Sequence, residues 1–325
     1  MSDLPTSVYL NEEGPREGFQ IEAATIPTAR KIELVDRLAQ TGLRHIQVAS
    51  FVNPRAVPGM ADADAVVQGF RPVPGVEFTA LWLNQKGFQR ALGYRDRLAI
   101  NGSLNLYASD AFLMRNQNRV PGQQRAAQHE LIAMYQAAGV RVKRGFISAA
   151  FGCNYEGDIP VARVVRQVGE LLEIAAEHGE SIDHMGLGDT MAWATPESIR
   201  RVVGAVREAH PDLTILLHLH DTRGLGIANA YAGLQMGVRM FDSAVAGLGG
   251  CPFAGHKGAA GNVCTEDLVF MCEEMGIATG VDLDALIDCA RLAEDVVGHP
   301  LPGAVMRGGG LARFRTASRA AGGGR

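Results

Sequence analysis

Residues 214–262 read TILLHLHDTRGLGIANAYAGLQMGVRMFDSAVAGLGGCPFAGHKGAAGN, and this stretch decides the fold. It begins with an apolar strand (214–219), continues through a helical pattern (225–236) and a second apolar strand (240–245), and closes in a glycine-rich loop. A strand, a helix and a strand in this order form the unit from which parallel sheets are built. Such folds place their functional groups at the carboxyl ends of the strands, so polar residues there are candidates for a site.

The same alternation continues through the rest of the chain. Further strand patterns lie at 7–11, 44–50, 76–83, 97–104, 141–148 and 182–187, and helical patterns at 28–41, 61–69, 85–92, 121–138, 161–178, 196–210, 265–275 and 282–297. Eight strands, each followed by a helix, predict an α/β fold, a (β/α)8 TIM barrel with a C-terminal helical extension. A doubly wound sheet is the alternative, but no GxGxxG motif follows the first strand.

The composition fits one large globular domain. The chain has 325 residues, of which 47% are hydrophobic and 20% charged, and its net charge is −4. We predict a single barrel over residues 1–302, followed by a flexible tail over 303–325, which is rich in glycine and arginine and shows no periodicity. No basic cluster with interleaved aromatic residues is present, so nucleic acid is not an expected partner.

The remaining composition bears on location and redox state. The sequence has neither the pattern of an export signal nor an apolar run long enough to span a bilayer, so we expect a cytoplasmic protein without membrane contact. Its five cysteines have no CxxC spacing. Because the number of cysteines is odd and no CxxC pair is present, neither a disulfide framework nor a structural zinc site is expected.

Two histidines stand at the end of the 214–219 strand. His218 and His220 are two residues apart, so their side chains point to the same face and can bind one ion together. Histidines on strands also hydrogen-bond within protein cores, and the pair by itself therefore does not establish a metal site.

Other polar side chains follow the ends of the remaining predicted strands. In a barrel they share one rim with the two histidines: Arg16, Glu17, Gln47, Ser50, Asn84, Ser109, Asp189, Cys251 and Asn262. Imidazole, carboxylate and amide groups together suit a divalent ion that keeps positions open for water or substrate. Without a thiolate cluster, Mg²⁺ or Mn²⁺ is favoured over structural zinc. Taken singly, each residue also has an ordinary structural explanation. Glu17 is equally consistent with a solvated loop acid, Arg16 with a surface ion pair, and Asp189 with a helix cap.

Several segments carry a resemblance to a known family. They are GPREGFQ (14–20), NQKGF (84–88), GLGDT (186–190), HLHDTRG (218–224), GLGGCP (247–252) and GN-xx-TEDLV (261–269). On these segments the chain resembles 3-hydroxy-3-methylglutaryl-CoA lyase, within a wider group of metal-dependent barrel lyases and Claisen-type synthases. The resemblance extends from about Gly14 to Gly298. The GLGGCP loop and the last segment are specific to the lyase branch.

The resemblance implies a reaction and roles for the rim residues. The reaction is cleavage of the C2–C3 bond of a 3-hydroxyacyl-CoA thioester, which yields acetyl-CoA and a 3-oxo acid, and a homodimer is the expected assembly. The implied roles are metal binding by Glu17, His218, His220 and Asn262, enolate stabilisation by Arg16, and proton transfer by Cys251 on a mobile loop. We further assign orientation of water, metal or base to Asp189, and contacts with the CoA carrier to Lys257, Asn84 and Ser109.

This chain departs from the family pattern at positions that bear on substrate. Glu17 replaces the usual aspartate, Gln47 a usual glutamate, and Arg223 a usual tyrosine. If Arg223 faces the site, the rim is more positive by up to two charges. We therefore predict an acyl group with a longer C3 branch or an extra anionic group. Ala23 stands where the family often has a lysine, and Lys257 offers a replacement contact for the CoA phosphates.

Two other functions remain open. A Claisen-type acyltransferase that makes 2-isopropylmalate-like or homocitrate-like acids would use the same barrel, but such enzymes commonly carry further C-terminal regulatory sequence. A barrel that has lost catalysis and serves as a binding protein is the other alternative, and Gln47 and Glu17 keep it open. A binding protein has no need to retain a stoichiometric ion, so metal analysis separates it from the enzymes.

Overall fold

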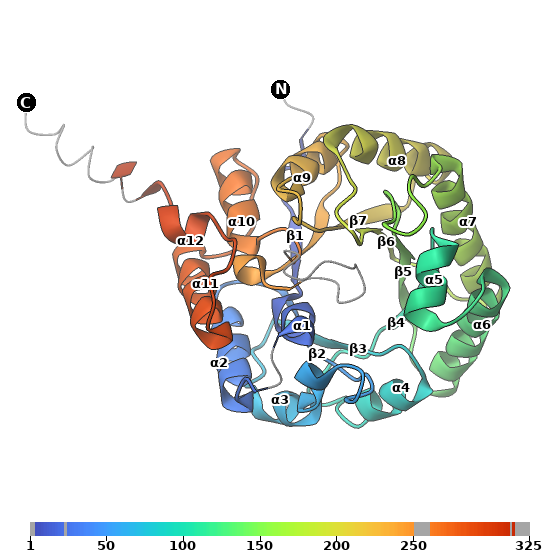
Figure 1. Cartoon of the computed structure of the whole chain (residues 1–325), viewed down its shortest axis with the longest axis horizontal. Helices are drawn as coiled ribbons and strands as arrows, with labels where there is room; N and C mark the ends of the chain where they lie inside the picture. The colour runs from blue at the N-terminus through green and yellow to red at the C-terminus, as the bar shows by residue number, and fades with distance from the viewer. Residues whose placement is uncertain (1–3, 23–24, 250–260, 313, 316–325) are drawn as a thin grey trace, which may run out of the picture.

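Eight parallel strands curl into a barrel, and the helices that connect them form a ring around it (Figure 1). The computed structural model describes the chain except for residues 1–3, 23–24, 250–260, 313 and 316–325. The strands are β1 Tyr9–Glu12, β2 His45–Ser50, β3 Glu77–Leu81, β4 Gly102–Tyr107, β5 Val142–Ser148, β6 His184–Asp189, β7 Thr214–Leu219 and β8 Met240–Ser243. The predicted TIM barrel is confirmed.

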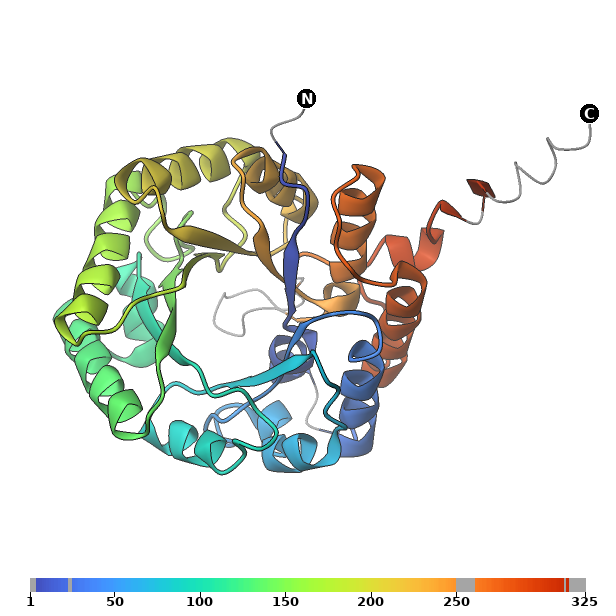
Figure 2. The same cartoon turned by 180° about the vertical axis from the view of Figure 1, so that it is seen from behind.

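The strands form one sheet in the order β3-β2-β1-β8-β7-β6-β5-β4, so the first and last strands of the chain are neighbours. A backbone hydrogen bond of 2.8 Å from the Ala99 N–H to the Phe78 carbonyl links the segment before β4 to β3. Figure 2, from the opposite side, shows the strands around one axis and the helices outside them. This arrangement brings the carboxyl ends of all the strands to one face of the barrel.

The predicted helices are present, with ends that differ by a few residues. They are α2 Thr28–Leu38, α3 Ala63–Gly69, α4 Gln85–Leu92, α6 Pro121–Ala137, α7 Val161–Glu177, α8 Pro196–Ala209, α9 Gly226–Gln235, α10 Thr265–Glu274 and α11 Leu283–Val297. Six short elements among the described residues were not predicted: a π-helix at Gly14–Gly18, α1 Phe19–Ile21, 3-10 helices at Pro58–Met60 and Val245–Gly247, α5 Asp110–Gln117 and α12 Val305–Gly308. Five of them are too short to show a hydrophobic period, and in α5 the apolar residues 111–114 are consecutive rather than three or four positions apart.

One predicted strand was placed too early. Residues 97–104 were expected to form the fourth strand, whereas β4 begins at Gly102. The Arg97 and Leu98 N–H groups instead bond to the Tyr94 carbonyl at 2.9 and 2.8 Å, which closes a turn. Leu98 is buried in that turn, and burial of an apolar residue outside a strand explains the error in the pattern.

Glycines in β6 make room for an aromatic ring beside the predicted site. A Cβ atom at Gly186 would lie 2.3 Å from the Phe146 ring, and one at Gly188 would lie 2.8 Å from it. The ring of Phe146 therefore lies against the backbone of β6. Its centroid is 5.6 Å from that of His218, in an edge-on arrangement. The sequence GLGD thus helps to set the packing around His218.

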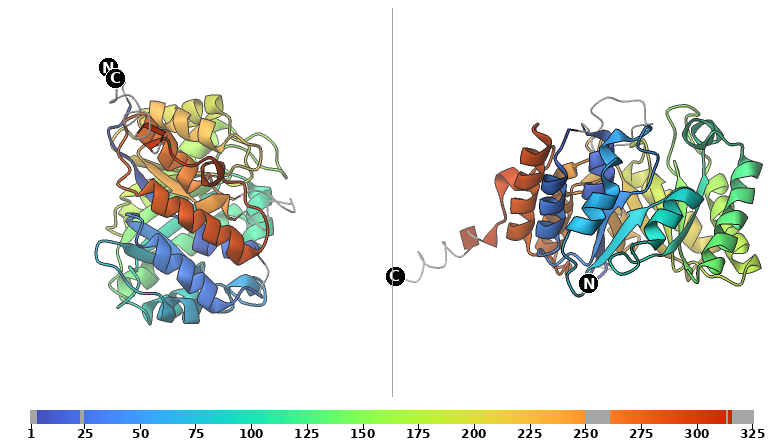
Figure 3. Two further views of the ribbon diagram at one scale, coloured as in Figure 1. Left: turned by 90° about the vertical axis from the view of Figure 1, so that its left-hand side faces the viewer. Right: turned by 90° about the horizontal axis from the view of Figure 1, so that it is seen from below.

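The C-terminal extension packs against the barrel beside α2 (Figure 3). The Asp267 carboxylate of α10 accepts hydrogen bonds from the Ala304 and Val305 N–H groups at the start of α12. Met306 is only 3% exposed, and Arg307 donates to Glu294 of α11 at 2.8 Å. The predicted flexible tail over 303–325 therefore begins with a packed helix, and residues 316–325 lie outside the described part of the chain.

Two expectations from composition can be compared with the described residues. Their four cysteines, Cys153, Cys264, Cys272 and Cys289, are all free and buried, as expected for a chain without a disulfide framework. Among these same residues, no helix combines the length and apolar character that crossing a bilayer requires.

Candidate active site

The segment that follows β1 brings an arginine and a glutamate into the mouth of the barrel. Residues Gly14–Gly18 form one wide turn, in which the Glu17 N–H bonds to the Glu13 carbonyl at 2.7 Å. Only glycine fits at Gly18, because a Cβ atom there would lie 2.3 Å from the Leu248 side chain. The turn thereby presents Arg16 and Glu17 side by side, with Arg16 Nη1 2.9 Å from Glu17 Oε2.

Glu17 meets both histidines of β7. His220 Nε2 lies 2.8 Å from Glu17 Oε1, and His218 Nε2 lies 3.6 Å from Glu17 Oε2. One ligand atom from each of the three residues lies within 4.8 Å of the others, and all three side chains are buried. Burial raises the pKa of Glu17, but the neighbouring charges of Arg16 and His218 outweigh it and hold that pKa well below 4.5. An ionised carboxylate and two imidazoles therefore converge on one point.

The opposite nitrogen of each imidazole has its own partner. His218 Nδ1 lies 2.9 Å from Asp242 Oδ2, and His220 Nδ1 lies 3.1 Å from the Asp189 backbone carbonyl. Asn11 and Arg144 donate to Asp242 at 2.8 and 2.6 Å. If a divalent ion displaces the protons on Nε2, these partners would keep a proton on each Nδ1 and direct the Nε2 lone pairs to the ion, which is the arrangement typical of metal-binding histidines.

Asn262 completes the predicted set of ligands. Its backbone pairs with that of His220. Its side chain is fully buried, and neither Oδ1 nor Nδ2 has a hydrogen-bond partner among the residues that the structure describes. A buried amide without partners is costly, so this group fits a site where a ligand supplies the missing interaction. Carboxylate, two imidazoles and an amide oxygen match the donors that a divalent ion takes.

Arg16 lies among three acceptors. Besides Glu17, its Nε donates to Gln47 Oε1 on β2 and to Glu13 Oε2 at 3.1 Å, and its Nη2 also pairs with Glu13. The sequence analysis predicted a place for Gln47 on the rim but missed Glu13. Two consecutive acids at the end of a predicted strand, Glu12 and Glu13, were the available indication. Glu13 supplies a negative charge that the predicted count of rim charges lacked.

Asp189 lies at the end of β6 and braces the loop that follows it. Its Oδ1 accepts the N–H groups of Trp193 and Ala194 at 2.7 and 2.9 Å. Its Oδ2 is buried and has no hydrogen-bond partner in the described part of the chain. Burial raises the pKa of Asp189 to about 6. Asp189 is therefore not a helix cap, because the next helix, α8, is capped by Thr195. Its side chain holds the loop after β6 and still has one oxygen open.

Two predicted carrier contacts are helix caps in the structure. Asn84 is exposed, and its Oδ1 accepts the Gly87 N–H at 3.0 Å at the start of α4. Ser109 accepts the Phe112 N–H at 3.1 Å and donates to Cys153 Sγ at 3.0 Å. Ser109 is fully buried, and this burial leaves it no surface with which to bind CoA. Its predicted role is replaced by that of an N-cap for α5.

The remaining predicted residues are divided between a loop and the part of the chain that is not described. Arg223 is exposed and donates to the Met191 and Ala192 carbonyls at 2.8 and 2.9 Å, so the loop after β6 binds its guanidinium. The prediction that Arg223 adds a positive charge to the site required its side chain to face the site rather than to bond to this loop. Cys251 and Lys257 lie within 250–260, outside the described residues.

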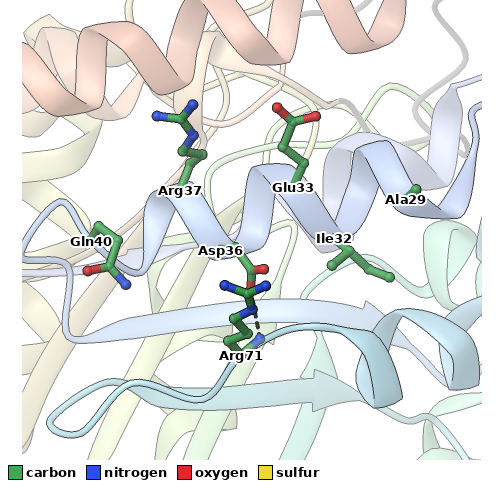
Figure 4. A pocket seen from close by; sticks show the side chains of 7 residues that line it. All are labelled: Ala29, Ile32, Glu33, Asp36, Arg37, Gln40 and Arg71. Atoms are coloured by element: carbon green, nitrogen blue, oxygen red, sulfur yellow. Dashed lines mark hydrogen bonds between the residues drawn. The ribbon is translucent and has the colours of Figure 1, made fainter.

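A separate hollow on the outer surface contains none of these residues. It has a volume of about 540 Å³ and lies along α2, between Ile32, Asp36 and Arg71 (Figure 4). The Arg71 N–H bonds to Asp36 Oδ1 at 2.7 Å across it. Both signs of charge line the hollow, and no cluster of catalytic groups converges there. The predicted site residues that the structure describes lie at the strand ends instead.

Comparisons with known proteins identify the family of this chain. The sequence profile of the HMGL-like family matches residues 7–293. The chain is 42% identical to the cytoplasmic 3-hydroxy-3-methylglutaryl-CoA lyase of Mus musculus over 89% of this chain and 80% of that protein. It is 37% identical to the hydroxymethylglutaryl-CoA lyase YngG of Bacillus subtilis over 92% and 96%.

Solved structures give the same result. A hydroxymethylglutaryl-CoA lyase from Pseudomonas aeruginosa aligns with a TM-score of 0.85 and 39% identity, covering 94% of this chain and 98% of that one. An HMG-CoA lyase from Acinetobacter baumannii, in complex with coenzyme A and 3-methylmalate, aligns with a TM-score of 0.83 and 36% identity, covering 96% and 98%. The chain belongs to the HMGL-like family.

Proposed function

We propose that this protein is a carbon–carbon lyase that cleaves 3-hydroxy-3-methylglutaryl-CoA to acetyl-CoA and acetoacetate, with a divalent metal ion. Relatives that carry the name of this activity match most of the chain at 37 to 42% identity. The single observation that carries the proposal is the convergence of Glu17, His218 and His220 beside Arg16. A charged arginine next to a metal-binding set suits a reaction that develops negative charge on a thioester oxygen.

The residues present fit a divalent ion. Glu17, His218, His220 and Asn262 would hold it, and the unpartnered amide of Asn262 is the observation on which this assignment depends. When bound, such an ion acts as a Lewis acid that lowers the pKa of the substrate C3 hydroxyl. We propose Mg²⁺ or Mn²⁺, because oxygen atoms dominate the ligand set once substrate is bound.

The remaining steps are stabilisation of the negative charge and transfer of protons, and different side chains carry them out. Arg16 pairs with the thioester oxygen as the enolate forms. The Asp189 carbonyl orients His220, and the open Oδ2 of Asp189 can accept a hydrogen bond from water or substrate. In our proposal Cys251 protonates the enolate carbon from the loop that joins β8 to α10, which closes over the substrate. Lys257, from the same loop, contacts a phosphate of CoA.

The structure weakens one argument for an altered acyl group. The expected change was up to two extra positive charges on the rim. Glu13, which pairs with Arg16, supplies a negative charge, and the Arg223 guanidinium is bound by loop carbonyls. The parent compound is therefore the substrate that we propose. A substrate with a longer C3 branch remains an alternative, and a panel of thioesters tests it.

The experiment is a release assay for free acetyl-CoA. Several 3-hydroxyacyl-CoA esters are incubated with enzyme that has been stripped by a chelator and then supplied with Mg²⁺, Mn²⁺ or neither. We expect turnover of the parent thioester that requires added metal, and loss of turnover by at least about 100-fold in His220→Ala. Release from no ester, together with tight binding of CoA, would support a binding barrel. Consumption of acetyl-CoA with a 2-oxo acid would instead support a Claisen-type synthase.

We also propose a homodimer in the cytoplasm. The mouse relative at 42% identity is named as a cytoplasmic protein, and this name supports the location. Light scattering coupled to gel filtration measures the assembly directly. A mass near that of one 34.7 kDa chain would contradict the dimer.

A further inference from the structure

Arg16 is held by a group of three side chains, which we call the arginine clamp: Glu13, Gln47 and Glu17. They come from three places, the end of β1, the middle of β2 and the turn after β1. Glu13 Oε2 bonds to both Nε and Nη2 of Arg16, Gln47 Oε1 accepts from the same Nε, and Glu17 Oε2 lies 2.9 Å from Nη1. The whole guanidinium is therefore fixed in one plane.

The three members of the clamp are not equivalent. Glu17 also lies 2.8 Å from His220 and 3.6 Å from His218, so its carboxylate is shared with the predicted metal site. Gln47 carries no charge. Glu13 is thus the one charged member whose side-chain hydrogen bonds, among the described residues, all go to Arg16.

Glu13 is also fully buried, and its Oε1 has no hydrogen-bond partner among the residues that the structure describes. A carboxylate in this setting is stable only when a cation lies against it. A residue needed only to fill the space would be apolar at lower cost. The buried carboxylate of Glu13 is therefore explained by its interaction with the positive charge of Arg16.

We infer that Glu13 is a positioning residue for Arg16, which holds the guanidinium in the plane where Nη1 faces the substrate. This inference rests on the proposed function, because it assigns to Arg16 the stabilisation of the enolate. One carboxylate oxygen of Glu13 accepts from both Nε and Nη2, and the Gln47 amide oxygen accepts from Nε as well, so these contacts restrict rotation of the guanidinium. Positioning of this kind acts mainly on the transition state, since a displacement of about 1 Å can cost about 100-fold in rate.

The first test is Glu13→Gln, which keeps the shape and removes the charge. We expect kcat for acetyl-CoA release to fall about 10- to 100-fold while KM changes less than about twofold. The control is Glu170→Gln, which removes a carboxylate from another arginine pair, that of Arg125 and Glu170 between α6 and α7 on the outer ring. That variant should keep the wild-type kcat. A Glu13→Gln enzyme with unchanged kcat would overturn the inference.

The second test moves the charge across the clamp. Because Glu13 and Gln47 bond to the same Nε–H of Arg16, a carboxylate at position 47 can replace the one lost at position 13. Glu13→Gln combined with Gln47→Glu should therefore recover at least about tenfold of the lost kcat. A purely structural role for Glu13 predicts no recovery, since the double variant differs from native packing at both positions. Equal kcat in the single and double variants would contradict our inference.

A readout independent of activity guards against misfolding. Arginine labelled with ¹⁵N reports on the Nε–H of Arg16, whose resonance is assigned by its loss in Arg16→Lys. We expect slow hydrogen exchange of this group in the wild type, faster exchange in Glu13→Gln, and slow exchange again in the double variant. Unchanged exchange in Glu13→Gln would count against the inference. If the wild type releases no acetyl-CoA but the exchange rates change as expected, the proposed function fails and the clamp remains.

Discussion

At the scale of single residues, the site is defined by polar groups that the fold leaves unsatisfied. Asn262 has two buried side-chain atoms without partners in the described part of the chain, and Glu13 and Asp189 have one each. Folded proteins rarely tolerate such groups unless a ligand or water completes them. Each of the three contacts a residue of the candidate site. Glu13 bonds to Arg16, the Asp189 carbonyl bonds to His220, and the Asn262 backbone pairs with that of His220. These residues therefore point to the place where ligands bind.

Asn262 gives a prediction in which two measurements move in opposite directions. In Asn262→Leu, the metal-free protein should melt at the same or a higher temperature, because two unsatisfied polar atoms are replaced by apolar ones of similar size. Binding of Mn²⁺, followed by electron paramagnetic resonance, should weaken at least about tenfold because a ligand is lost. Wild-type affinity for Mn²⁺ in this variant would remove Asn262 from the ligand set.

At the scale of elements, the site depends on how the end of β1 is tied to β8 and α10. Glu12, at the end of β1, accepts hydrogen bonds from the Gly14 and Val245 N–H groups at 2.8 and 2.9 Å. It also accepts the Thr265 hydroxyl at 2.7 Å. These bonds connect the turn that carries Arg16 and Glu17 to the segments on either side of the loop 250–260. A single buried acid therefore holds three elements of the site together.

Glu12 makes stability depend on pH in a defined direction. Burial raises the pKa of Glu12 from its usual 4.5 to about 8 in the folded protein. Between these values the unfolded chain loses this proton and the folded chain keeps it, so the contribution to stability falls as pH rises from 4.5 to 8. Below pH 4.5 both states are protonated and the loss disappears.

The variant Glu12→Gln should remove this dependence. Its amide oxygen keeps the acceptor for the two N–H groups, and its amide nitrogen donates to the Thr265 oxygen, whose hydroxyl hydrogen then goes to Ser243 Oγ, 2.9 Å away. The free energy of unfolding of the variant, relative to wild type, should therefore increase between pH 5 and pH 8, by about 1.4 kcal/mol for each unit of the pKa difference. Urea melts across this range measure it. Parallel curves for the two proteins would show that Glu12 does not titrate in this interval.

At the scale of the whole molecule, the C-terminal extension is part of the folded barrel. Helix α11 packs beside α2, and α10 and α12 pack against α11 (Figure 3). An ion pair between Arg30 of α2 and Asp295 of α11 and the Asp267 contacts to α12 connect them. Helix α12 therefore contributes to stability, although the composition of its segment predicts no structure.

Met306 tests this conclusion. It is 3% exposed, so Met306→Ala should lower the free energy of unfolding by roughly 2 kcal/mol or more through lost burial and the cavity left behind. Met114→Ala is the matched control, because Met114 is 44% exposed and its loss should change stability by less than about 0.5 kcal/mol. Equal stability of the two variants would mean that α12 does not pack on the barrel in solution.

The sequence predicted the residues of the site better than their roles. The HxH pair and the GPREG turn were found because strand ends in a barrel share one rim, whatever the details of each loop. Ser109 and Asn84 lie at strand ends too, but both cap helices, and the sequence does not distinguish a cap from a ligand contact. Glu13 was missed because an acid at the end of a strand is usually solvated, and only packing shows that it is buried.

The alternation of strand and helix patterns predicted the barrel and its shared rim from the sequence alone. That is possible because the hydrophobic period is a local property of the chain. The tertiary structure alone decided that Glu13 faces Arg16, that loop carbonyls hold Arg223, and that α12 is packed. The contacts of Arg223 and of α12 join residues more than 30 positions apart, and no local pattern encodes their energies. Glu13 is only three residues from Arg16, but its burial and the Gln47 acceptor beside it come from packing against other parts of the chain.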